Sequence, residues 1–185
     1  MQQQPTLETE RLTLRPFSFA DAPELQRLAG SREIARLTIG IPHPYEDGRA
    51  EQWIATHEAA FDNSQSVHFA LIIRQKQVFC GVVGLEIHRQ NHNAMLGYWI
   101  GTPYWGQGYC TEAARAIVDY GFHTLDLHRI YSEHFHCNPA SGRVMQKLGM
   151  KYEGCLREQI FKWSHYEDLV EYGILKREWQ EARKS

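Results

Sequence analysis

One segment, residues 97–113, constrains the fold of this chain most, because a strand-like run passes into a helix-like run through a short glycine-bearing loop. Gly106 and Gly108 lack a Cβ, so the main chain there can approach a ligand closely. The N–H groups of a first helical turn have no partner inside the helix, and the helix dipole adds about half a positive charge. The segment therefore predicts an anion site, with pyrophosphate as the natural guest, although an ordinary strand–turn–helix connection has the same pattern.

The composition is that of one ordinary soluble domain, which we expect to span residues 1–185. With 185 residues, of which 43% are hydrophobic and 23% charged, a chain buries about 70% of its unfolded surface and needs no disulfide or metal scaffold. No linker, repeat or compositional shift separates a second domain. A net charge of −2 argues against direct nucleic-acid binding driven by electrostatics.

Neither a membrane nor a metal is expected as a partner. The longest apolar runs, such as residues 69–73, are too short to span a bilayer, and the opening Met-Gln-Gln-Gln-Pro is unlike a secretion signal. We therefore expect a cytoplasmic protein. The four cysteines form no C-x-x-C pair. His134 and His136 share one face of a strand, but no third ligand follows at a recognisable spacing.

Hydrophobic periodicity predicts an α+β domain with a mixed central sheet. Strands are expected at residues 11–17, 67–74, 78–88, 94–100, 130–136, 151–157 and 167–175. Helices are expected after the cap Asp21, from residue 31, and near 46–61, 111–124 and 140–148. The three strands between residues 67 and 100 follow one another through short turns, so they should form an antiparallel meander.

A series of motifs across almost the whole chain resembles the Gcn5-related N-acetyltransferase (GNAT) superfamily. Its segments are Trp105-Gly106-Gln107-Gly108-Tyr109-Cys110-Thr111-Glu112-Ala113, Arg129-Ile130, Asn138-Pro139-Ala140-Ser141, Lys147-Leu148-Gly149-Met150, Glu153-Gly154, the opening Leu7-Glu8-Thr9-Glu10-Arg11-Leu12, and the closing Tyr166-Glu167-Asp168 and Glu178-Trp179. Within the superfamily, the motifs are most similar to the branch of bacterial ribosomal-protein alanine and serine N-terminal acetyltransferases. The motif core covers residues 94–154.

The resemblance implies a single GNAT-like domain: a mixed, mostly antiparallel sheet with helices on both faces and a splayed parallel strand pair, 94–100 and 130–136. It also implies acetyl-coenzyme A (acetyl-CoA) as co-substrate, with the pantetheine arm between the splayed strands and the pyrophosphate on the main chain of residues 107–111. The implied cofactor-binding residues are Trp99, Ile100, Trp105, Gly106, Gln107, Gly108, Tyr109, Cys110, Thr111 and Asn138.

Two positions depart from the broad superfamily pattern R/Q-x-x-G-x-G/A, and a third carries an unusual residue. Trp105 and Cys110 stand at its two ends, as is familiar in the narrower branch. Neutral Gln107 stands where a basic residue is often found, so pyrophosphate binding should depend on backbone dipoles more than on a side-chain cation.

Acyl transfer needs an uncharged amine, a polarised carbonyl and a proton for the departing thiolate. The tyrosine that supplies this proton in much of the superfamily corresponds to Met145, which cannot donate one. The resemblance implies Ser141 as the acid instead; the alternative is a serine that only bonds the backbone of the first helical turn. Asn138 is expected to bind the pantetheine arm or to cap the helix.

The sequence leaves the identity of the general base open between two carboxylates. A related enzyme carries its acidic base where this chain has Ile160, and Glu158 lies two residues earlier. Glu86, on a central strand, is the other candidate; either carboxylate could instead be merely solvated or ion-paired. An α-amine with a pKa near 8 is about a tenth neutral at pH 7, whereas a lysine-type amine is almost wholly charged. A site without a strong base therefore suits the α-amine.

The expected function is acetyl transfer from acetyl-CoA to a primary amine, foremost a protein N-terminal α-amine. A small amine such as a polyamine, amino acid or aminoglycoside is the alternative acceptor, because acceptor loops vary freely on one fold. The third reading is a catalytically silent acyl-CoA-binding module. A homodimer is compatible with all three readings, and the sequence leaves the oligomeric state open.

Overall fold

A computed structural model describes residues 3–183, and within them eight strands form one sheet in the order β1-β2-β3-β4-β5-β6-β8-β7. The strands are β1 Leu7–Glu8, β2 Leu12–Arg15, β3 Ser66–Ile73, β4 Val78–His88, β5 Asn93–Ile100, β6 Arg129–Phe135, β7 Lys151–Lys162 and β8 His165–Leu175. All neighbouring strands are antiparallel except β5 and β6, which are parallel. The expected mixed sheet and meander are therefore confirmed.

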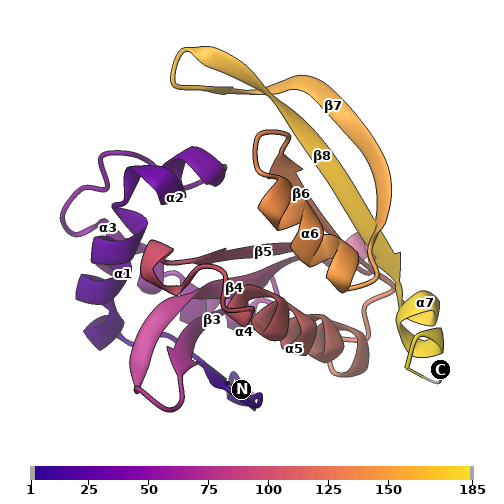
Figure 1. The fold of residues 1–185 in the computed structure, drawn as a ribbon. Coiled ribbons are helices and arrows are strands. Elements are labelled where there is room, and N and C mark those ends of the chain that lie inside the picture. The colour runs from indigo at the N-terminus through magenta and orange to yellow at the C-terminus, as the bar shows by residue number, and fades with distance from the viewer. Residues whose placement is uncertain (1–2, 184–185) are drawn as a thin grey trace.

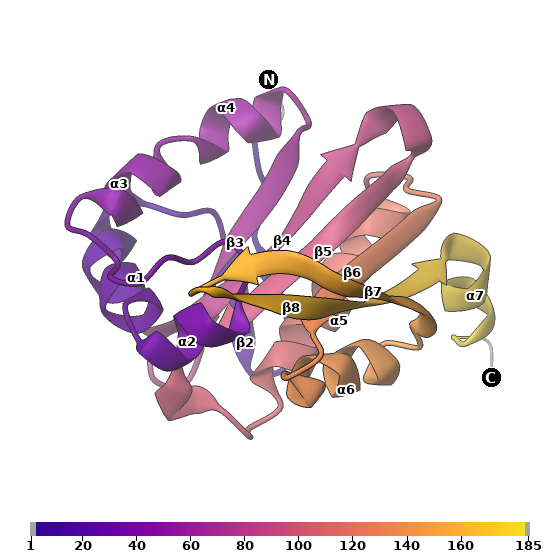
Figure 2. The ribbon, with the colours of Figure 1, turned by 90° about the horizontal axis from the view of Figure 1, so that it is seen from above.

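Helices cover both faces of the sheet (Figures 1 and 2). They are α1 Ala22–Ala29, α2 Arg32–Leu37, α3 Arg49–Ile54, α4 His57–Asp62, α5 Tyr109–His123, α6 Pro139–Lys147 and α7 Lys176–Glu181. Successive residues of β3 enter different cores: Phe69 packs in the core that contains α5 and α6, and Ala70 in the core that contains α1 and α3. This follows from the two-residue period of a strand, which sends neighbouring side chains to opposite faces.

The parallel pair separates after a short contact. The ladder between β5 and β6 holds only at three pairs, Asn93 with Arg129, Ala94 with Ile130, and Met95 with Tyr131. One further link follows, in which Ser132 Oγ donates to the Leu96 carbonyl at 2.7 Å. Beyond this point β6 stays paired with β8 and β5 with β4, so a gap opens between β5 and β6.

Two expected elements differ from the structure. The helix expected at residues 46–61 is two helices: α3 ends at Ile54 and α4 begins at His57, with Thr56 between them as the N-cap residue of α4 and its hydroxyl donating to the Trp53 carbonyl at 2.7 Å. The strand expected at 151–157 continues to Lys162, where β7 and β8 form a long hairpin that curves over the upper side of the molecule in Figure 1. The charged tail after residue 175 begins as α7, with Trp179 buried.

The start of α1 is held by a buried carboxylate. Asp21 is 6% exposed and accepts hydrogen bonds from Arg15 Nη1 and Nη2 at 2.8 and 2.6 Å and from the Ser18 N–H at 2.8 Å. Burial by itself would raise the pKa of Asp21, but the hydrogen bonds from Arg15 and Ser18 outweigh it and hold the pKa below the ordinary value.

We expect Asp21→Asn to lower the free energy of unfolding by about 2 kcal/mol at pH 7, because it leaves the Arg15 charge without its partner. A depressed folded pKa stabilises the protein above the unfolded pKa, and this contribution is lost as the pH falls through the folded value. The Tm of the variant should therefore lie below that of the natural protein at pH 7 and approach it below about pH 4. Thermal unfolding at both pH values checks this; an equal gap at both would contradict it.

Candidate active site

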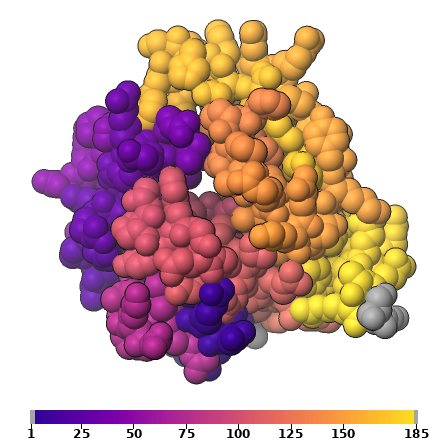
Figure 3. All heavy atoms as spheres, in the orientation of Figure 1, coloured from indigo at the N-terminus to yellow at the C-terminus, as the bar shows by residue number. Residues whose placement is uncertain are grey.

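A cavity of about 810 Å³ lies where β5 and β6 separate. It is lined by the facing parts of these strands, the loop after β5, the first turns of α5 and α6, and residues 37–42. Figure 3 shows the opening between the indigo α1–α2 segment, the pink-red loop after β5 and the orange α6. The cavity therefore has one wall from the central sheet and another from the N-terminal helices.

The glycine-bearing loop forms one end of the cavity as expected. Gly106 and Gly108 have φ angles of +74° and +82°, a left-handed conformation that favours glycine. Gly108 is the N-cap of α5, and Tyr109, Cys110 and Thr111 make its first turn, whose N–H groups lack partners inside the helix. Gly108 and these three residues line the cavity, as do Gly106 and Trp105. The arrangement can hold a phosphate-type anion.

Gln107 lies apart from this lining. Its carbonyl accepts a hydrogen bond from Arg11 Nη1 at 2.9 Å, and its side-chain amide donates to the Pro103 carbonyl at 3.4 Å. The Gln107 carbonyl and one hydrogen of its side-chain amide are thus engaged within the protein.

The unpaired edge of β5 offers main-chain groups to a ligand in the gap. The Gly101 N–H donates to the Cys80 carbonyl of β4 at 2.8 Å, so by strand alternation the main-chain groups of Trp99 also face β4. Those of Tyr98 and Ile100 face the gap, and the Ile100 carbonyl accepts from Trp105 Nε1 at 2.6 Å. Ile100 is therefore placed as expected, whereas Tyr98 takes the main-chain position assigned to Trp99 in the sequence analysis.

Ser141 lies in the first turn of α6 at the cavity wall. Its hydroxyl is 3.0 Å from that of Tyr98, and either oxygen can donate in this contact. The Tyr98 hydroxyl also lies 3.0 Å from the Ser141 carbonyl, and burial raises the pKa of Tyr98. Met145, one turn further on, is fully buried in the core. Within this helix Ser141 is thus the hydroxyl that meets the cavity.

Asn138 has a local role. Its Oδ1 accepts from the Ser141 N–H at 3.3 Å as the N-cap of α6, and its Nδ2 donates to the Leu37 carbonyl at 3.4 Å. Of the two roles foreseen for Asn138, helix capping is the one present in the structure. The residue also lines the cavity.

Glu86 is brought to the cavity with two histidines behind it. Its Oε1 lies 3.1 Å from His68 Nε2, and this hydrogen bond outweighs the opposing effect of burial and lowers the pKa of Glu86. The ring of His57 stacks on that of His68 with 4.9 Å between centroids. Burial, followed by the neighbouring His68, lowers the pKa of His57 to about 3, so His57 is uncharged at neutral pH. The site therefore holds an ionised, half-exposed carboxylate.

Glu158 is not brought to the cavity. It lies exposed in a bulge of β7 with φ of +52°, and its N–H donates to Asp168 Oδ1 at 2.8 Å. The cavity lining does not include it. The strand parity assumed from the sequence is lost because the pairing of β7 with β8 shifts between Leu156 and Ile160.

His68, Tyr98 and Glu133 are among the residues that line the cavity without having been assigned to the site by the sequence analysis. Burial and the neighbouring Glu171 raise the pKa of Glu133. A lone histidine in the apolar run 66–73 was the available signal for His68. For Tyr98 and Glu133 no local signal existed, because their roles depend on which strand lies beside them.

Within residues 3–183, no group of three or more His, Cys, Asp or Glu side chains is arranged to hold a metal ion. Over the same residues, no helix is both long enough and apolar enough to cross a bilayer.

The chain is similar to known acetyltransferases over most of its length. The acetyltransferase (GNAT) domain family matches residues 11–151. The uncharacterised N-acetyltransferase YoaA of Bacillus subtilis is 30% identical over 173 residues, 93% of this chain and 97% of its own. The spermidine N(1)-acetyltransferase of Vibrio cholerae is 27% identical, covering 90% and 94%. The ribosomal protein uS5-alanine N-acetyltransferase of Escherichia coli is 26% identical, covering 63% and 61%.

Solved structures share the fold along nearly the whole chain. A GNAT-family acetyltransferase from Bacillus anthracis superposes with a TM-score of 0.82 at 25% identity, covering 94% of this chain and 99% of its own. RimL, a ribosomal L7/L12 α-N-protein acetyltransferase in complex with coenzyme A, superposes with a TM-score of 0.84 at 17% identity, covering 92% and 98%.

Proposed function

This chain belongs to the GNAT acetyltransferase family and is an N-acetyltransferase, and from that premise we propose that it transfers acetyl from acetyl-CoA to the α-amine of a protein N-terminus. The observation that carries the choice of acceptor is the lowered pKa of Glu86, the carboxylate at the cavity. The relatives named for ribosomal proteins are consistent with this acceptor class.

Acetyl-CoA fits the groups that the cavity offers. The free N–H groups at the start of α5 suit its pyrophosphate, and the main-chain groups of Tyr98 and Ile100 suit a pantetheine amide lying along β5 as an added strand. Trp99, Trp105, Cys110 and Asn138 then form walls of the same cavity. Coenzyme A is bound in the structure of RimL, which has a similar fold.

Two residues of this chain can handle the protons that move during the reaction. The neutral amine nitrogen forms a bond to the acetyl carbon while the carbon–sulfur bond breaks. Glu86 accepts the proton that the acceptor nitrogen loses, and the Ser141 hydroxyl donates a proton to the departing sulfur. His68 orients Glu86, and the Tyr98 hydroxyl, 3.0 Å away, helps to fix the Ser141 hydroxyl. After the transfer, Glu86 releases its proton to solvent and Ser141 recovers one from solvent.

A carboxylate with a lowered pKa is a weak base, and this favours the acceptor amine with the lower pKa. An α-amine has a pKa near 7.7–8.0, whereas a lysine-type amine has one near 10.4, which makes deprotonation at pH 7 about 3 kcal/mol more costly. A site with a weak base suits the amine that is already partly neutral. An N-terminal α-amine is such an amine.

We expect kcat/KM with an N-terminal peptide to rise from pH 6 to about pH 8 and then level off. Because the pKa of Glu86 is lowered, this carboxylate is ionised over the whole range, and the rise follows the neutral fraction of the acceptor amine. Glu86→Gln should lower the plateau about 10- to 100-fold without moving the rise. Initial rates of thiol release between pH 6 and 9 measure both effects.

Glu158→Gln is the matched comparison, because it removes the other candidate carboxylate, which lies outside the cavity. It should leave the profile unchanged. A loss of rate in Glu158→Gln with full activity in Glu86→Gln would reverse the assignment of the base.

A small polycation is the second candidate acceptor, favoured by one observation. Glu133 on β6 lines the same cavity as Glu86 and has Glu171 as a neighbour, so the cavity carries more than one acidic group. A relative named for spermidine covers 90% of this chain. Thiol release with peptides and with spermidine, at equal concentrations, separates the two: a spermidine rate far above the peptide rates would overturn the N-terminal acceptor.

A further inference from the structure

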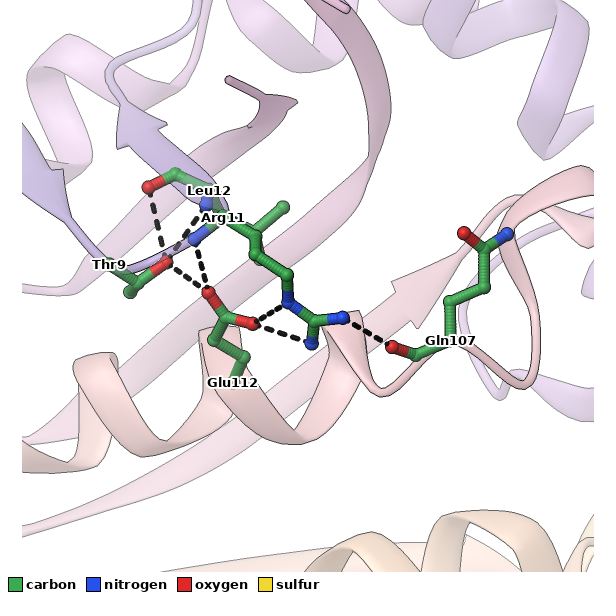
Figure 4. Close-up of polar contacts among 5 residues, drawn as sticks. All are labelled: Thr9, Arg11, Leu12, Gln107 and Glu112. Atoms are coloured by element: carbon green, nitrogen blue, oxygen red, sulfur yellow. Dashed lines mark hydrogen bonds and ion pairs between the residues drawn. The ribbon is translucent and has the colours of Figure 1, made fainter. Parts of the chain in front are cut away.

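Thr9 and Arg11, near the start of the chain, bind the carboxylate of Glu112 in the first turn of α5 (Figure 4). Oε1 of Glu112 accepts from Thr9 Oγ1 at 2.6 Å and from the Arg11 N–H at 2.8 Å. Oε2 accepts from Arg11 Nε at 2.7 Å and pairs with Arg11 Nη2 at 2.7 Å. Burial by itself would raise the pKa of Glu112, but these contacts outweigh it and lower the pKa. Glu112 is therefore an ionised group beside the candidate pyrophosphate loop.

The same guanidinium reaches the loop itself. Arg11 Nη1 donates to the Gln107 carbonyl at 2.9 Å, and the guanidinium lies 4.8 Å from the centroid of the Tyr109 ring. Arg11 and Glu112 are not among the residues that line the cavity, whereas Gly108 and Tyr109 are. Arg11 thus holds the loop from the side that faces away from the cavity.

The planar peptide between Gln107 and Gly108 links this contact to the cavity. In a trans peptide the C=O and the following N–H point in opposite directions. Because Arg11 holds the Gln107 carbonyl outward, the Gly108 N–H is directed to the opposite side. The loop has no basic side chain between residues 106 and 111, so the orientation of such N–H groups and the neutralisation of Glu112 contribute to how well the loop accepts an anion.

We infer that Arg11 is a positioning residue for the pyrophosphate of acetyl-CoA, which it serves by orienting the Gly108 N–H and neutralising Glu112. The inference rests on the proposed function, because it takes the loop after β5 as the pyrophosphate site. It assigns a role to an N-terminal residue 96 positions away from the loop in the sequence. Arg11 replaces, from the far side of the loop, the cation that Gln107 does not supply.

The test measures binding of acetyl-CoA and of S-acetylpantetheine, which lacks the pyrophosphate, by calorimetry. Arg11→Gln should raise the Kd for acetyl-CoA about tenfold and leave that for S-acetylpantetheine unchanged. The double variant Arg11→Gln/Glu112→Gln removes the unneutralised carboxylate as well and should recover to within about threefold of the natural Kd. A purely structural role of Arg11 would weaken both ligands together.

Arg74→Gln is the matched control. Arg74 donates to the Thr9 carbonyl at 2.9 Å and so anchors the same segment without touching Glu112 or the loop. Its Kd for acetyl-CoA should be unchanged. The inference is overturned if Arg11→Gln stays within twofold of the natural Kd, if both ligands weaken equally, if the double variant does not recover, or if Arg74→Gln loses as much. Absence of acetyl-CoA binding by the natural protein would instead contradict the proposed function.

Discussion

Gly108→Asp is expected to abolish the thermal shift that acetyl-CoA produces, while the variant without ligand stays folded. A Cβ on residue 108 lies 3.3 Å from Arg11 Nη2, and the φ angle of +82° strains any side chain there. An aspartate would therefore distort the turn, compete with Glu112 and the Gln107 carbonyl for Arg11, and add a negative charge next to the pyrophosphate site. A ligand at 100 times its Kd adds about 2.7 kcal/mol, so loss of this stabilisation is readily measured.

Two further variants at position 108 separate the effect of the added side chain from the effect of its negative charge. Gly108→Ala adds a Cβ at a φ angle of +82° and so strains the turn, but it adds no charge. This Cβ would meet only Arg11 Nη2, at 3.3 Å. Gly108→Asn has the shape of aspartate without its charge, and asparagine tolerates a positive φ better than most residues. The loss of acetyl-CoA affinity should be largest for Asp. If Gly108→Asp keeps the full shift, the loop does not bind the pyrophosphate.

Ser141→Ala is expected to lower kcat about 10²- to 10⁴-fold with little change in the Kd for acetyl-CoA. The hydroxyl would act on charge that develops at sulfur only as the carbon–sulfur bond breaks, so the ground-state complex barely depends on it. Met145 is buried in the core and cannot replace it. Steady-state rates and calorimetric binding of the one variant measure the two quantities.

Tyr98→Phe accompanies this test, because the Tyr98 hydroxyl is the protein partner 3.0 Å from Ser141 Oγ. We expect a loss of kcat about tenfold, smaller than for Ser141→Ala, since the serine hydroxyl itself remains. An unchanged kcat in Ser141→Ala would remove the serine from the catalytic group and leave solvent as the proton source. A lost acetyl-CoA affinity would instead make it a binding residue.

The predictions from sequence were accurate where the deciding interactions are local. The meander, the helix that starts after Gly108 and the cap at Asn138 each follow from residues within a few positions of one another. The expected continuous helix 46–61 was wrong because the chain forms two helices with a break between Ile54 and His57, although the apolar stripe continues across the break. Periodicity reports which face is buried, not whether the helix is continuous.

By itself the sequence determined the fold class, the family and the glycine-bearing loop, because these depend on local periodicity and on residue types at fixed spacings. Only the tertiary structure decided the partners of the site residues. Glu86 meets His68, and Arg11 meets Glu112 and Gln107, across pairings remote in sequence, and Glu158 leaves the cavity through a bulge. Such contacts depend on strand register and helix docking, where a shift of one residue turns a side chain to the opposite face.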